Sequence, residues 1–569
     1  MPLVHMLDEA QAHLGAGRLD DAGHLYQAIV AQQPGHPEAH HGLGLIALGQ
    51  HRVAEAIGHL RTTLQGEPTL ARNWLFYLEA LIQGGQAGSA LEVLAQGRDH
   101  GLEGPEADAL EQRARHLARV QEATILAAEH FHAGRYEASL DCFHLILRYQ
   151  PANGPMHNNM GSALFRLGRL EEAENSFRRA VDLTPDYALA HYNLGTVLME
   201  FGRVEAAMEC FRHALRLSPE YDLAHENLDV AMLLQSRRLV EAGRVDEAVD
   251  LLVDHEFRWT AVNIEVSTHC NLKCVNCQRT IEVAHDRWDN RHMSPETFRK
   301  VIGNIPPTQM CHLTWLGEPT LNPALPELVD IARESGRFRL IRLTTNALAR
   351  DAGYYRDLVA RGVEHILISA DSFTPAIVRQ TRPGTNVKKL LTRIAELKGI
   401  APMVGISYTL SRINIADFEH TLAELDRIGG VTVVVDFLSD FSETSDHRIV
   451  ADDLAHLRKM ADEAAARYPN IGIQIMAYQS ERYPVAHSEY CNTILTAPAI
   501  TVDGMYAPCC MWREERFIGG LDLAAMTFRE AKHSPAFREF IRSFIQRRPD
   551  FCSRCSQNVR TLEDVVSPA

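Results

Sequence analysis

The chain has 569 residues, which is too long for a single hydrophobic core, so three or four domains are expected. Apolar residues make up 46% and charged residues 23% of the sequence, as in ordinary soluble proteins, and no apolar run approaches the length of a membrane span. The net charge of −16 argues against nucleic acid as the main partner, because phosphate binding requires a concentrated basic surface.

The N-terminus has neither the basic nor the apolar segment of an export signal. In such a chain, eleven cysteines, an odd number, indicate ligands and free thiols rather than disulfides. We therefore expect a protein of the reducing cytoplasm.

A period of 34 residues runs through the first part of the chain. It is carried by three glycines (Gly134, Gly168, Gly202), three phenylalanines (Phe143, Phe177, Phe211) and three prolines (Pro151, Pro185, Pro219). These positions resemble those of the tetratricopeptide repeat, a pair of helices that stacks on its neighbours into a superhelix with a concave groove. We expect an all-α array over residues 1–257. It would have three units in 1–105, a weaker connecting stretch near residues 106–120, three units in 121–224 and a degenerate pair in 225–257. A groove that docks a peptide or protein is favoured over a helical spacer.

After Phe257 short β-rich runs alternate with amphipathic helical segments, which predicts βα units around a parallel sheet over residues 258–478. Strands are expected at 262–266, 312–316, 340–344, 365–369, 403–408 and 431–436, with helices between them, for example at 294–303 and 325–335. Reactive groups are then expected at the carboxyl ends of the strands.

Three cysteines, Cys270, Cys274 and Cys277, follow the first of these strands with C-x3-C-x2-C spacing. Thiolates are the natural ligands of iron–sulfur clusters, and three of them leave the fourth iron of a [4Fe–4S] cube without a protein ligand. The alternative is a zinc knuckle, which needs a fourth ligand. His269 and His285 are available, but neither has a usual zinc-finger offset.

The cysteine run closely resembles the signature of the radical S-adenosylmethionine (SAM) superfamily. The resemblance implies a partial (β/α)6 barrel in which the amino and carboxylate groups of SAM chelate the open iron. One electron from the cluster then splits SAM into methionine and a 5′-deoxyadenosyl radical.

Later segments extend this resemblance in the family's order. Leu316-Gly317-Glu318-Pro319 is similar to its Gly-Gly-Glu-Pro segment, Thr344-Thr345-Asn346-Ala347 to its Thr-Asn-Gly turn, and Ser369-Ala370-Asp371-Ser372 to its Ser-Leu-Asp-Gly turn. The resemblance implies SAM-binding roles for Gly317, Glu318, Asn346, Ser369, Asp371 and Arg382, with Glu318 at the SAM amino group and Ser369 and Arg382 at its carboxylate. Leu316 replaces the first glycine, and Asn276 stands where an aromatic residue is common.

The tail, residues 479–569, carries a second cysteine set. Cys491, Cys509, Cys552 and Cys555 resemble the four ligands of the twitch module, a shortened SPASM domain of α+β class that holds one auxiliary [4Fe–4S] cluster. A helix is expected at 534–545, and a four-cysteine zinc ribbon is the competing interpretation. The chain would thus hold two [4Fe–4S] clusters. Cys311, in contrast, is expected to be a buried thiol.

Substrate groups are expected at the barrel mouth. Tyr408, Asp436 and Cys510 are the catalytic candidates, with Tyr408 or Cys510 as a source of a hydrogen atom or proton. Asn263, Glu265, Trp315, Tyr478 and Trp512 are further candidates for lining the site. Packing is the competing interpretation for each of them.

Three functions remain open on the sequence. The favoured one is hydrogen-atom abstraction from a peptide or protein docked on the repeats, with a flavodoxin or ferredoxin as reductant and the auxiliary cluster handling electrons. The second is a twitch-type dehydrogenase or epimerase of a sugar, aminocyclitol or glycan. The third is a non-catalytic repeat scaffold with a redox-sensing cluster domain, although a scaffold does not need the cysteines and the SAM-binding residues together.

Overall fold

The computed structural model describes residues 2–437, 459–460, 463–464, 466–475, 497–507 and 521–546. The chain forms two compact units, residues 1–197 and 198–569, and the division falls inside helix α11 (Ala188–Glu200). No helix of the described residues is both long and apolar enough to cross a membrane.

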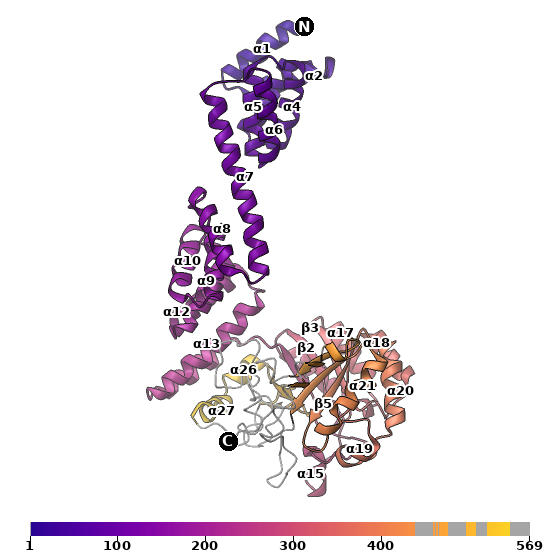
Figure 1. Cartoon of the computed structure of the whole chain (residues 1–569). Helices are drawn as coiled ribbons and strands as arrows, with labels where there is room; N and C mark the ends of the chain where they lie inside the picture. The colour runs from indigo at the N-terminus through magenta and orange to yellow at the C-terminus, as the bar shows by residue number, and fades with distance from the viewer. Residues whose placement is uncertain are drawn as a thin grey trace. The chain divides into compact units, whose positions relative to one another are not determined.

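The first unit is all-helical, and consecutive helices pack in pairs (Figure 1). Small residues lie where helices meet: Ala22, Ala56 and Ala90 are fully buried. Gly161 faces the ring of Phe177, and a Cβ there would be 2.8 Å from that ring. The helices before α11 are α1 (Leu3–Gly15), α2 (Leu19–Gln32), α3 (Pro37–Gly49), α4 (Val53–Gly66), α5 (Ala71–Gln83), α6 (Ala87–Asp99), α7 (Pro105–His132), α8 (Tyr136–Tyr149), α9 (Gly154–Arg166) and α10 (Leu170–Leu183). The predicted repeat array is confirmed.

The stretch predicted as a weak connection, residues 106–120, is instead the first half of helix α7. Helix α7 has 28 residues, starts at Pro105 after Gly104 (φ 114°), and continues into the first helix of the next repeat. Ala107, Leu110 and Ala114 are buried on the side that packs against the preceding repeats. The 34-residue pattern is lost here because one continuous helix replaces a helix, a turn and a second helix.

The second unit begins with the end of the repeats, helices α12 (Val204–Leu217), α13 (Asp222–Glu241) and α14 (Val245–Asp254). Helices α13 and α14 pack against α27 (Pro535–Gln546), and ion pairs Arg538–Asp250 and Arg542–Asp246 join α14 to α27. The buried apolar residues of α27, among them Phe537, Phe540 and Phe544, belong to one side of an amphipathic helix. The predicted helix at 534–545 is confirmed.

A nine-stranded sheet with the order β7-β6-β5-β4-β3-β2-β1-β8-β9 forms the centre of this unit, and all neighbours are parallel except β8 and β9. The strands are β1 (Ala261–Ile264), β2 (Thr308–Leu313), β3 (Phe338–Thr345), β4 (His365–Ser369), β5 (Met403–Leu410), β6 (Thr432–Phe437), β7 (Gly472–Ile475), β8 (Ala499–Ile500) and β9 (Tyr506–Ala507). The prediction of an α/β region with a parallel sheet is confirmed.

The second strand is displaced from its expected position, 312–316. It begins at Thr308 and pairs through Thr308–Leu313 with β3, so Trp315 and Leu316 belong to the following loop. Cys311 is therefore in mid-strand and fully buried, and burial raises the pKa of its thiol, as expected for an inert cysteine.

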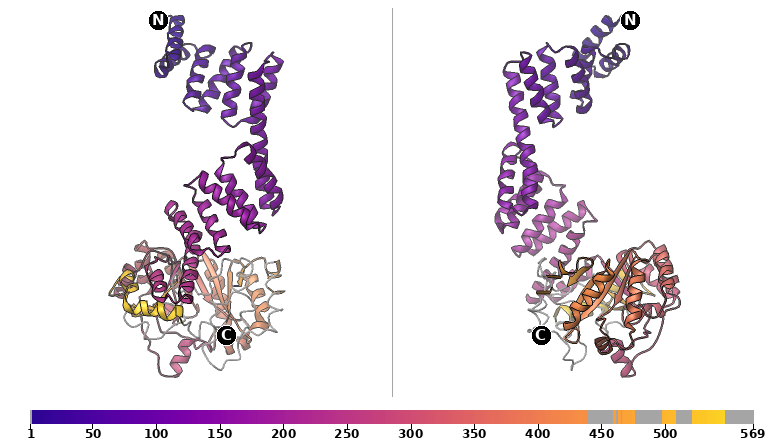
Figure 2. Two further views of the ribbon diagram at one scale, coloured as in Figure 1. Left: turned by 90° about the vertical axis from the view of Figure 1, so that its left-hand side faces the viewer. Right: turned by 45° about the vertical axis from the view of Figure 1, so that its right-hand side comes forward.

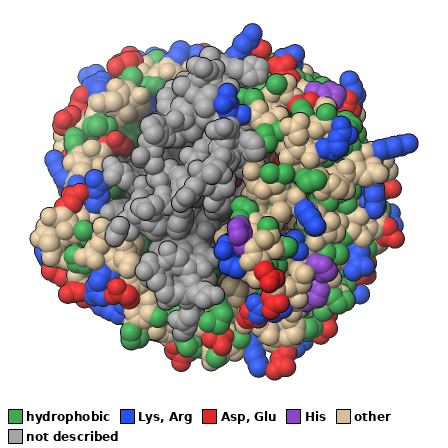
Figure 3. Space-filling model, turned by 90° about the horizontal axis from the view of Figure 1, so that it is seen from below, with side chains coloured by type: hydrophobic (Ala, Val, Ile, Leu, Met, Phe, Trp, Pro, Cys, Tyr) green, Lys and Arg blue, Asp and Glu red, His purple; other side chains and the backbone are tan. Residues whose placement is uncertain are grey.

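Helices follow the strands, and α17, α18, α20 and α21 lie along one side of the sheet in Figures 1 and 2. Ser294 caps α16 by accepting a hydrogen bond from the Thr297 amide at 3.1 Å. The remaining helices are α15 (Gln278–Ala284), α16 (Pro295–Asn304), η1 (Pro319–Leu321), α17 (Leu325–Glu334), α18 (Ala352–Arg361), α19 (Pro375–Thr381), α20 (Val387–Lys398), η2 (Ile415–Asp417), α21 (Phe418–Ile428) and α26 (Phe528–Lys532). On the described surface of the face in Figure 3, basic and acidic side chains are interspersed.

Candidate functional site

A cavity of about 270 Å3 lies at the carboxyl ends of strands β2 to β5. It is lined by every residue that the sequence predicted for the first cluster and for SAM: Cys270, Cys274, Cys277, Gly317, Glu318, Asn346, Ser369, Asp371 and Arg382. Parallel strands bring these residues together because their carboxyl ends meet at one edge of the sheet.

The cysteines lie on the loop between β1 and α15, and hydrogen bonds to its backbone hold this loop. The Thr268 carbonyl accepts from Arg279 Nε (2.9 Å) and from Trp288 Nε1 (3.0 Å). The Thr268 hydroxyl donates to the Asp289 carbonyl at 2.6 Å. The Val275 amide donates to the Thr381 carbonyl at 3.0 Å, which ties the middle of the loop to the end of α19. The loop is thus positioned by protein contacts on both sides.

Gly317 allows the loop after β2 to touch the cysteine loop. A Cβ at this position would be 1.9 Å from the Ser267 carbonyl oxygen, a contact that no side chain tolerates. The next amide, of Glu318, donates to the His269 carbonyl at 2.7 Å. Glycine at position 317 is therefore a requirement of backbone packing.

The Glu318 carboxylate is only 2% exposed and accepts four hydrogen bonds from two neighbouring segments. Its oxygens accept from the Thr320 amide and hydroxyl (3.2 and 2.6 Å), the Thr345 hydroxyl (2.7 Å) and the Asn346 amide (2.8 Å). Burial raises the pKa of Glu318, and these bonds oppose that rise. Glu318 thus joins the loop after β2 to the end of β3, and it also lines the cavity.

The turn after β3 connects the cavity wall to the cysteine loop. Asn346 donates through Nδ2 to Asn271 Oδ1 at 2.8 Å and accepts from the Leu348 amide at 3.0 Å. Ala347 has φ 60°, the left-handed conformation that favours glycine, at the place where the resembled turn has its glycine. The turn therefore keeps its shape although the side chain differs.

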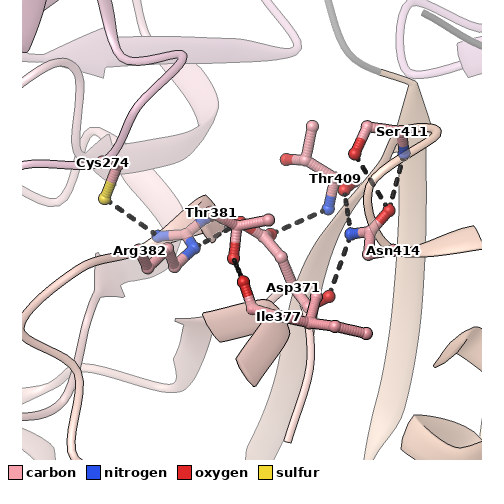
Figure 4. A network of polar contacts seen from close by, with 8 residues as sticks. All are labelled: Cys274, Asp371, Ile377, Thr381, Arg382, Thr409, Ser411 and Asn414. Carbon is pink, nitrogen blue, oxygen red and sulfur yellow. Dashed lines mark hydrogen bonds and ion pairs between the residues drawn. The ribbon is translucent and has the colours of Figure 1, made fainter. Parts of the chain in front are cut away.

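Asp371 and Arg382 form a two-bond ion pair at the cavity (Figure 4). Arg382 Nε and Nη2 donate to Asp371 Oδ2 and Oδ1 at 2.6 and 3.1 Å, and the third nitrogen, Nη1, lies 4.0 Å from Cys274 Sγ. The Thr409 amide donates to Asp371 at 3.1 Å, and Asn414 donates to the Asp371 carbonyl at 2.9 Å. The guanidinium thus has a fixed orientation between a carboxylate and a thiol.

The three thiols fit the open-site cluster that their spacing predicts. They belong to one loop, are free, and line one cavity. Burial raises the pKa of the Cys274 thiol to about 11, and the charge of Arg382 opposes this rise. Cluster binding would displace the protons, because iron binds the thiolate. Across the described ranges, no three His, Cys, Asp or Glu side chains, these thiols included, are grouped as one metal ion requires, so this geometry does not separate the cluster from the zinc alternative.

A polar network joins strands β1, β2 and β3, and it reaches the cavity at Thr344. His312 accepts a hydrogen bond at Nε2 from the Thr344 hydroxyl (2.6 Å), and its Nδ1 donates to Asn263 Oδ1 (3.0 Å). Burial lowers the pKa of His312 to about 3, so this imidazole is neutral. Asn263 was a candidate substrate residue, and here it holds His312 and, through Nδ2, the Ala497 carbonyl (3.3 Å).

The three catalytic candidates have different outcomes. Tyr408 is fully buried away from the cavity, packs on Phe418, and donates to the Asn414 carbonyl at 3.3 Å. This position does not favour Tyr408 as a hydrogen donor to a bound substrate. Asp436 lies on β6 directly opposite Thr409 of β5, and its role stays a prediction. Cys510 lies outside the described residues.

The auxiliary cysteines Cys491, Cys509, Cys552 and Cys555, with Tyr478 and Trp512, also lie outside the described residues, so their predicted roles stay predictions. Trp315 lines the cavity as expected. Glu265 is buried and accepts a 3.4 Å hydrogen bond from the Val502 amide.

The cavity also has a set of lining residues that the sequence-based prediction missed: Thr314, Thr344, Thr409 and Ser411. All four lie at or just after the carboxyl ends of strands, and that position was the available signal.

A second cavity, of about 580 Å3, lies within the repeats of the first unit, between helices α7 and α11. Its wall includes Phe131, Phe143, Phe165 and Phe177, the amides Asn158, Asn159 and Asn193, and the basic residues His132 and Arg166. Asn193 Nδ2 donates to Asn158 Oδ1 at 2.9 Å. The lining residues include neither Asp nor Glu.

Models of three known families match the chain. The radical SAM superfamily matches residues 264–425, the tetratricopeptide repeat matches 7–71, 125–188 and 158–222, and SPASM, an iron–sulfur cluster-binding domain, matches 491–556. The first match contains the three cysteines and all six residues predicted to bind SAM.

Two curated proteins illustrate the range of relatives. The chain is 22% identical over 290 residues to the 7,8-dihydro-6-hydroxymethylpterin dimethyltransferase of Methanocaldococcus jannaschii, a match covering 45% of this chain and 54% of that protein. It is 27% identical over 114 residues to the PqqA peptide cyclase of Streptomyces rochei, covering 20% and 30%. The match thus spans about half the length of the first relative and less of the second. Among solved structures, Streptococcus suis SuiB aligns with a TM-score of 0.43 and 14% identity over 68% of this chain and 87% of that one.

Proposed function

We propose that this chain, which belongs to the radical SAM superfamily and carries tetratricopeptide repeats before its barrel and a SPASM domain after it, abstracts a hydrogen atom from a peptide or protein docked on those repeats. Its cofactors are SAM and iron–sulfur clusters, with auxiliary cluster binding in the SPASM domain. When bound together, the first cluster and SAM supply a 5′-deoxyadenosyl radical.

The observation that carries the proposal is the cavity of about 580 Å3 within the repeats. Phe131 and Phe165, which are partly exposed, offer apolar surface to side chains, and Asn159 and Asn193 can donate to and accept from the backbone groups that an extended peptide exposes. A small metabolite handled only in the barrel needs no such surface. Among the curated relatives, the peptide cyclase has a name that includes a peptide substrate.

The charge of this cavity favours an acidic segment. Arg166 and His132 line it, no carboxylate does, and Arg166 makes no ion pair within the described first unit. We therefore propose a peptide with apolar side chains next to Asp or Glu.

At the barrel, the chain's own residues would position the reacting groups. Cys270, Cys274 and Cys277 would hold the cluster, and the walls formed by Glu318 and Asn346 would orient SAM over the carboxyl ends of the strands. A low-potential reductant such as flavodoxin or ferredoxin would supply the electron.

A small-molecule substrate is the second candidate. The pterin methyltransferase among the relatives supports it, because its name gives a small-molecule substrate. The repeats would then serve assembly, and the barrel would act on a sugar, an aminocyclitol or a glycan.

The test uses peptides selected from a phage-displayed random library on the reconstituted full-length protein. Enriched peptides are synthesised, incubated without oxygen with SAM and dithionite, and weighed by mass spectrometry. We expect acidic, apolar sequences to be enriched and a change in mass that depends on SAM.

Reversing the charge of Arg166 tests whether the cavity in the repeats binds acidic peptides. Arg166→Glu is expected to weaken binding of these peptides by roughly tenfold, the cost of turning an attractive charge contact into a repulsive one. Arg179→Glu is the matched control, because Arg179 lies on α10 outside the cavity lining. Equal peptide binding by both variants, or turnover of a sugar without any peptide, would reject the docking proposal.

A further inference from the structure

The orientation of Arg382 assigns this residue a role beyond that of a SAM ligand. The edge of its guanidinium that carries Nε and Nη2 is occupied, because both nitrogens donate to Asp371. The remaining nitrogen, Nη1, points to Cys274 Sγ at 4.0 Å (Figure 4). A guanidinium binds a carboxylate best through two parallel bonds, and here Asp371 already takes that position.

This arrangement is fixed by the backbone on both sides of the contact. The Val275 amide, adjacent to Cys274, donates to the carbonyl of Thr381, adjacent to Arg382, at 3.0 Å. Asp371 in turn is held by the Thr409 amide at 3.1 Å. The distance from the cation to the thiol is therefore set by the fold rather than by a flexible surface side chain.

The pair is also largely removed from water. Only 17% of the Arg382 side chain and 10% of the Asp371 side chain are exposed. Water and salt screen the electrostatic interaction between such buried charges only weakly. The cation lies next to the sulfur, and the carboxylate lies on its far side, so the two charges act on Cys274 with opposite signs.

We propose that the Asp371–Arg382 pair sets the reduction potential of the cluster held by Cys270, Cys274 and Cys277, with Arg382 raising it and Asp371 lowering it. This inference rests on the proposed function, because it requires the cluster. Net charge and hydrogen bonds near the sulfurs are the means by which proteins tune such potentials. Adding an electron makes the cluster more negative, so a nearby cation favours the reduced form and a nearby anion disfavours it.

The test measures the midpoint potential of this cluster in full-length protein reconstituted without oxygen, by redox titration followed by electron paramagnetic resonance. Addition of SAM to parallel samples identifies the signal, because SAM binds the open iron of this cluster and not a cluster with four protein ligands. Three variants are compared with the natural chain: Arg382→Gln, Asp371→Asn and the double variant.

The expected shifts have opposite signs. Arg382→Gln moves the midpoint to more negative potential, Asp371→Asn moves it to more positive potential, and the double variant lies between them. A purely structural role cannot produce opposite shifts from the two ends of one ion pair. Arg361→Gln is the control, since Arg361 of α18 forms a more exposed ion pair with Asp330 of α17, outside the lining of the cavity, and its midpoint should equal that of the natural chain.

Two further outcomes are decisive. Arg382→Gln leaves a buried carboxylate unpaired and can fail to load iron; Asp371→Asn and the double variant then decide the matter, because neither leaves a buried anion. Full iron content with unchanged midpoints in these two variants overturns the inference. So does loss of SAM affinity in Arg382→Gln with an unchanged midpoint, which would return Arg382 to the SAM carboxylate. Absence of any iron–sulfur cluster in the natural chain would instead reject the proposed function.

Discussion

At the scale of single residues, a close backbone contact shapes the cysteine loop. Gly317 brings the loop after β2 against Ser267, and the Glu318 amide then bonds to His269. The identity of residue 317 therefore controls the shape of the cysteine loop, although Gly317 has no side chain with which to bind iron.

Gly317→Ala is predicted to abolish the first cluster. The new Cβ would be 1.9 Å from a backbone oxygen, so no rotamer change can relieve the contact and the cysteine loop must move. Iron content after anaerobic reconstitution should fall from about eight to about four per chain, since each cube holds four. Gly303→Ala is the control, because nothing lies within 4 Å of the Cβ it would add. Full iron in Gly317→Ala would show that the two loops can separate without cost to the cluster.

The sequence allowed the residues that line the cavity to be grouped, because most of them belong to short motifs at the ends of strands, whereas Arg382 follows helix α19; their roles stay predictions. It did not allow Tyr408 to be placed correctly. Val404, Ile406, Tyr408 and Leu410 alternate along β5 and are buried, whereas Thr409 faces the cavity. An aromatic residue near a strand end can face either side, and a shift of one residue decides which. Only the register of β5 with β4 and β6 resolves that choice.

At the scale of elements, the turns between the two helices of a repeat need a residue with positive φ. Two of the first three repeats have glycine at this position, and one does not. Gly17 and Gly85 have φ of 73° and 71°, and the residue between them at the same 34-residue step is His51, with φ 57°. For a residue with a Cβ, this left-handed conformation is less stable by about 1–2 kcal/mol. The turn between α3 and α4 is therefore a weak point of the first unit.

His51→Gly should stabilise the repeats by about 0.5–1 kcal/mol, since relief of the left-handed strain exceeds the extra entropy that glycine loses on folding. The free energy of unfolding of the helices, followed by far-ultraviolet circular dichroism in urea, measures it. The reverse change, Gly17→His, is the matched variant, because nothing lies within 4 Å of its Cβ and only the backbone conformation is at issue. A loss of stability in His51→Gly would mean that contacts of the His51 ring outweigh the strain.

Element boundaries were harder to predict than element types. Strand β2 was expected to begin four residues too late, because the apolar residues of this segment lie mainly between Cys311 and Leu316. The polar residue Thr308 nevertheless pairs with β3 and begins the strand. Helix α7 was missed as a single helix because Pro105 and the alanines after it favour a helix start, but they carry no 34-residue repeat signal. For β2 the boundary is set by pairing with β3, whereas for α7 it is set by a local start signal at Pro105.

At the scale of the whole molecule, the radical SAM region follows an array of repeats for which we propose peptide docking. The last repeat helices, α13 and α14, pack on α27, which lies inside the SPASM match at residues 491–556. A shortened chain that begins near Phe257 would remove this packing and expose the apolar face of α27. Variants of the full-length chain are therefore the better test of what the repeats do.

The central claim is that Cys270, Cys274 and Cys277 hold a cluster that cleaves SAM. The most direct measurement is the yield of 5′-deoxyadenosine from the full-length protein, reconstituted without oxygen and reduced with dithionite, compared with a variant in which these three cysteines are alanine. The account predicts steady formation of 5′-deoxyadenosine by the natural chain and none by the variant, which should still keep about four irons in its second cysteine set. Equal 5′-deoxyadenosine formation by the two proteins, or none by either at full iron content, would contradict it.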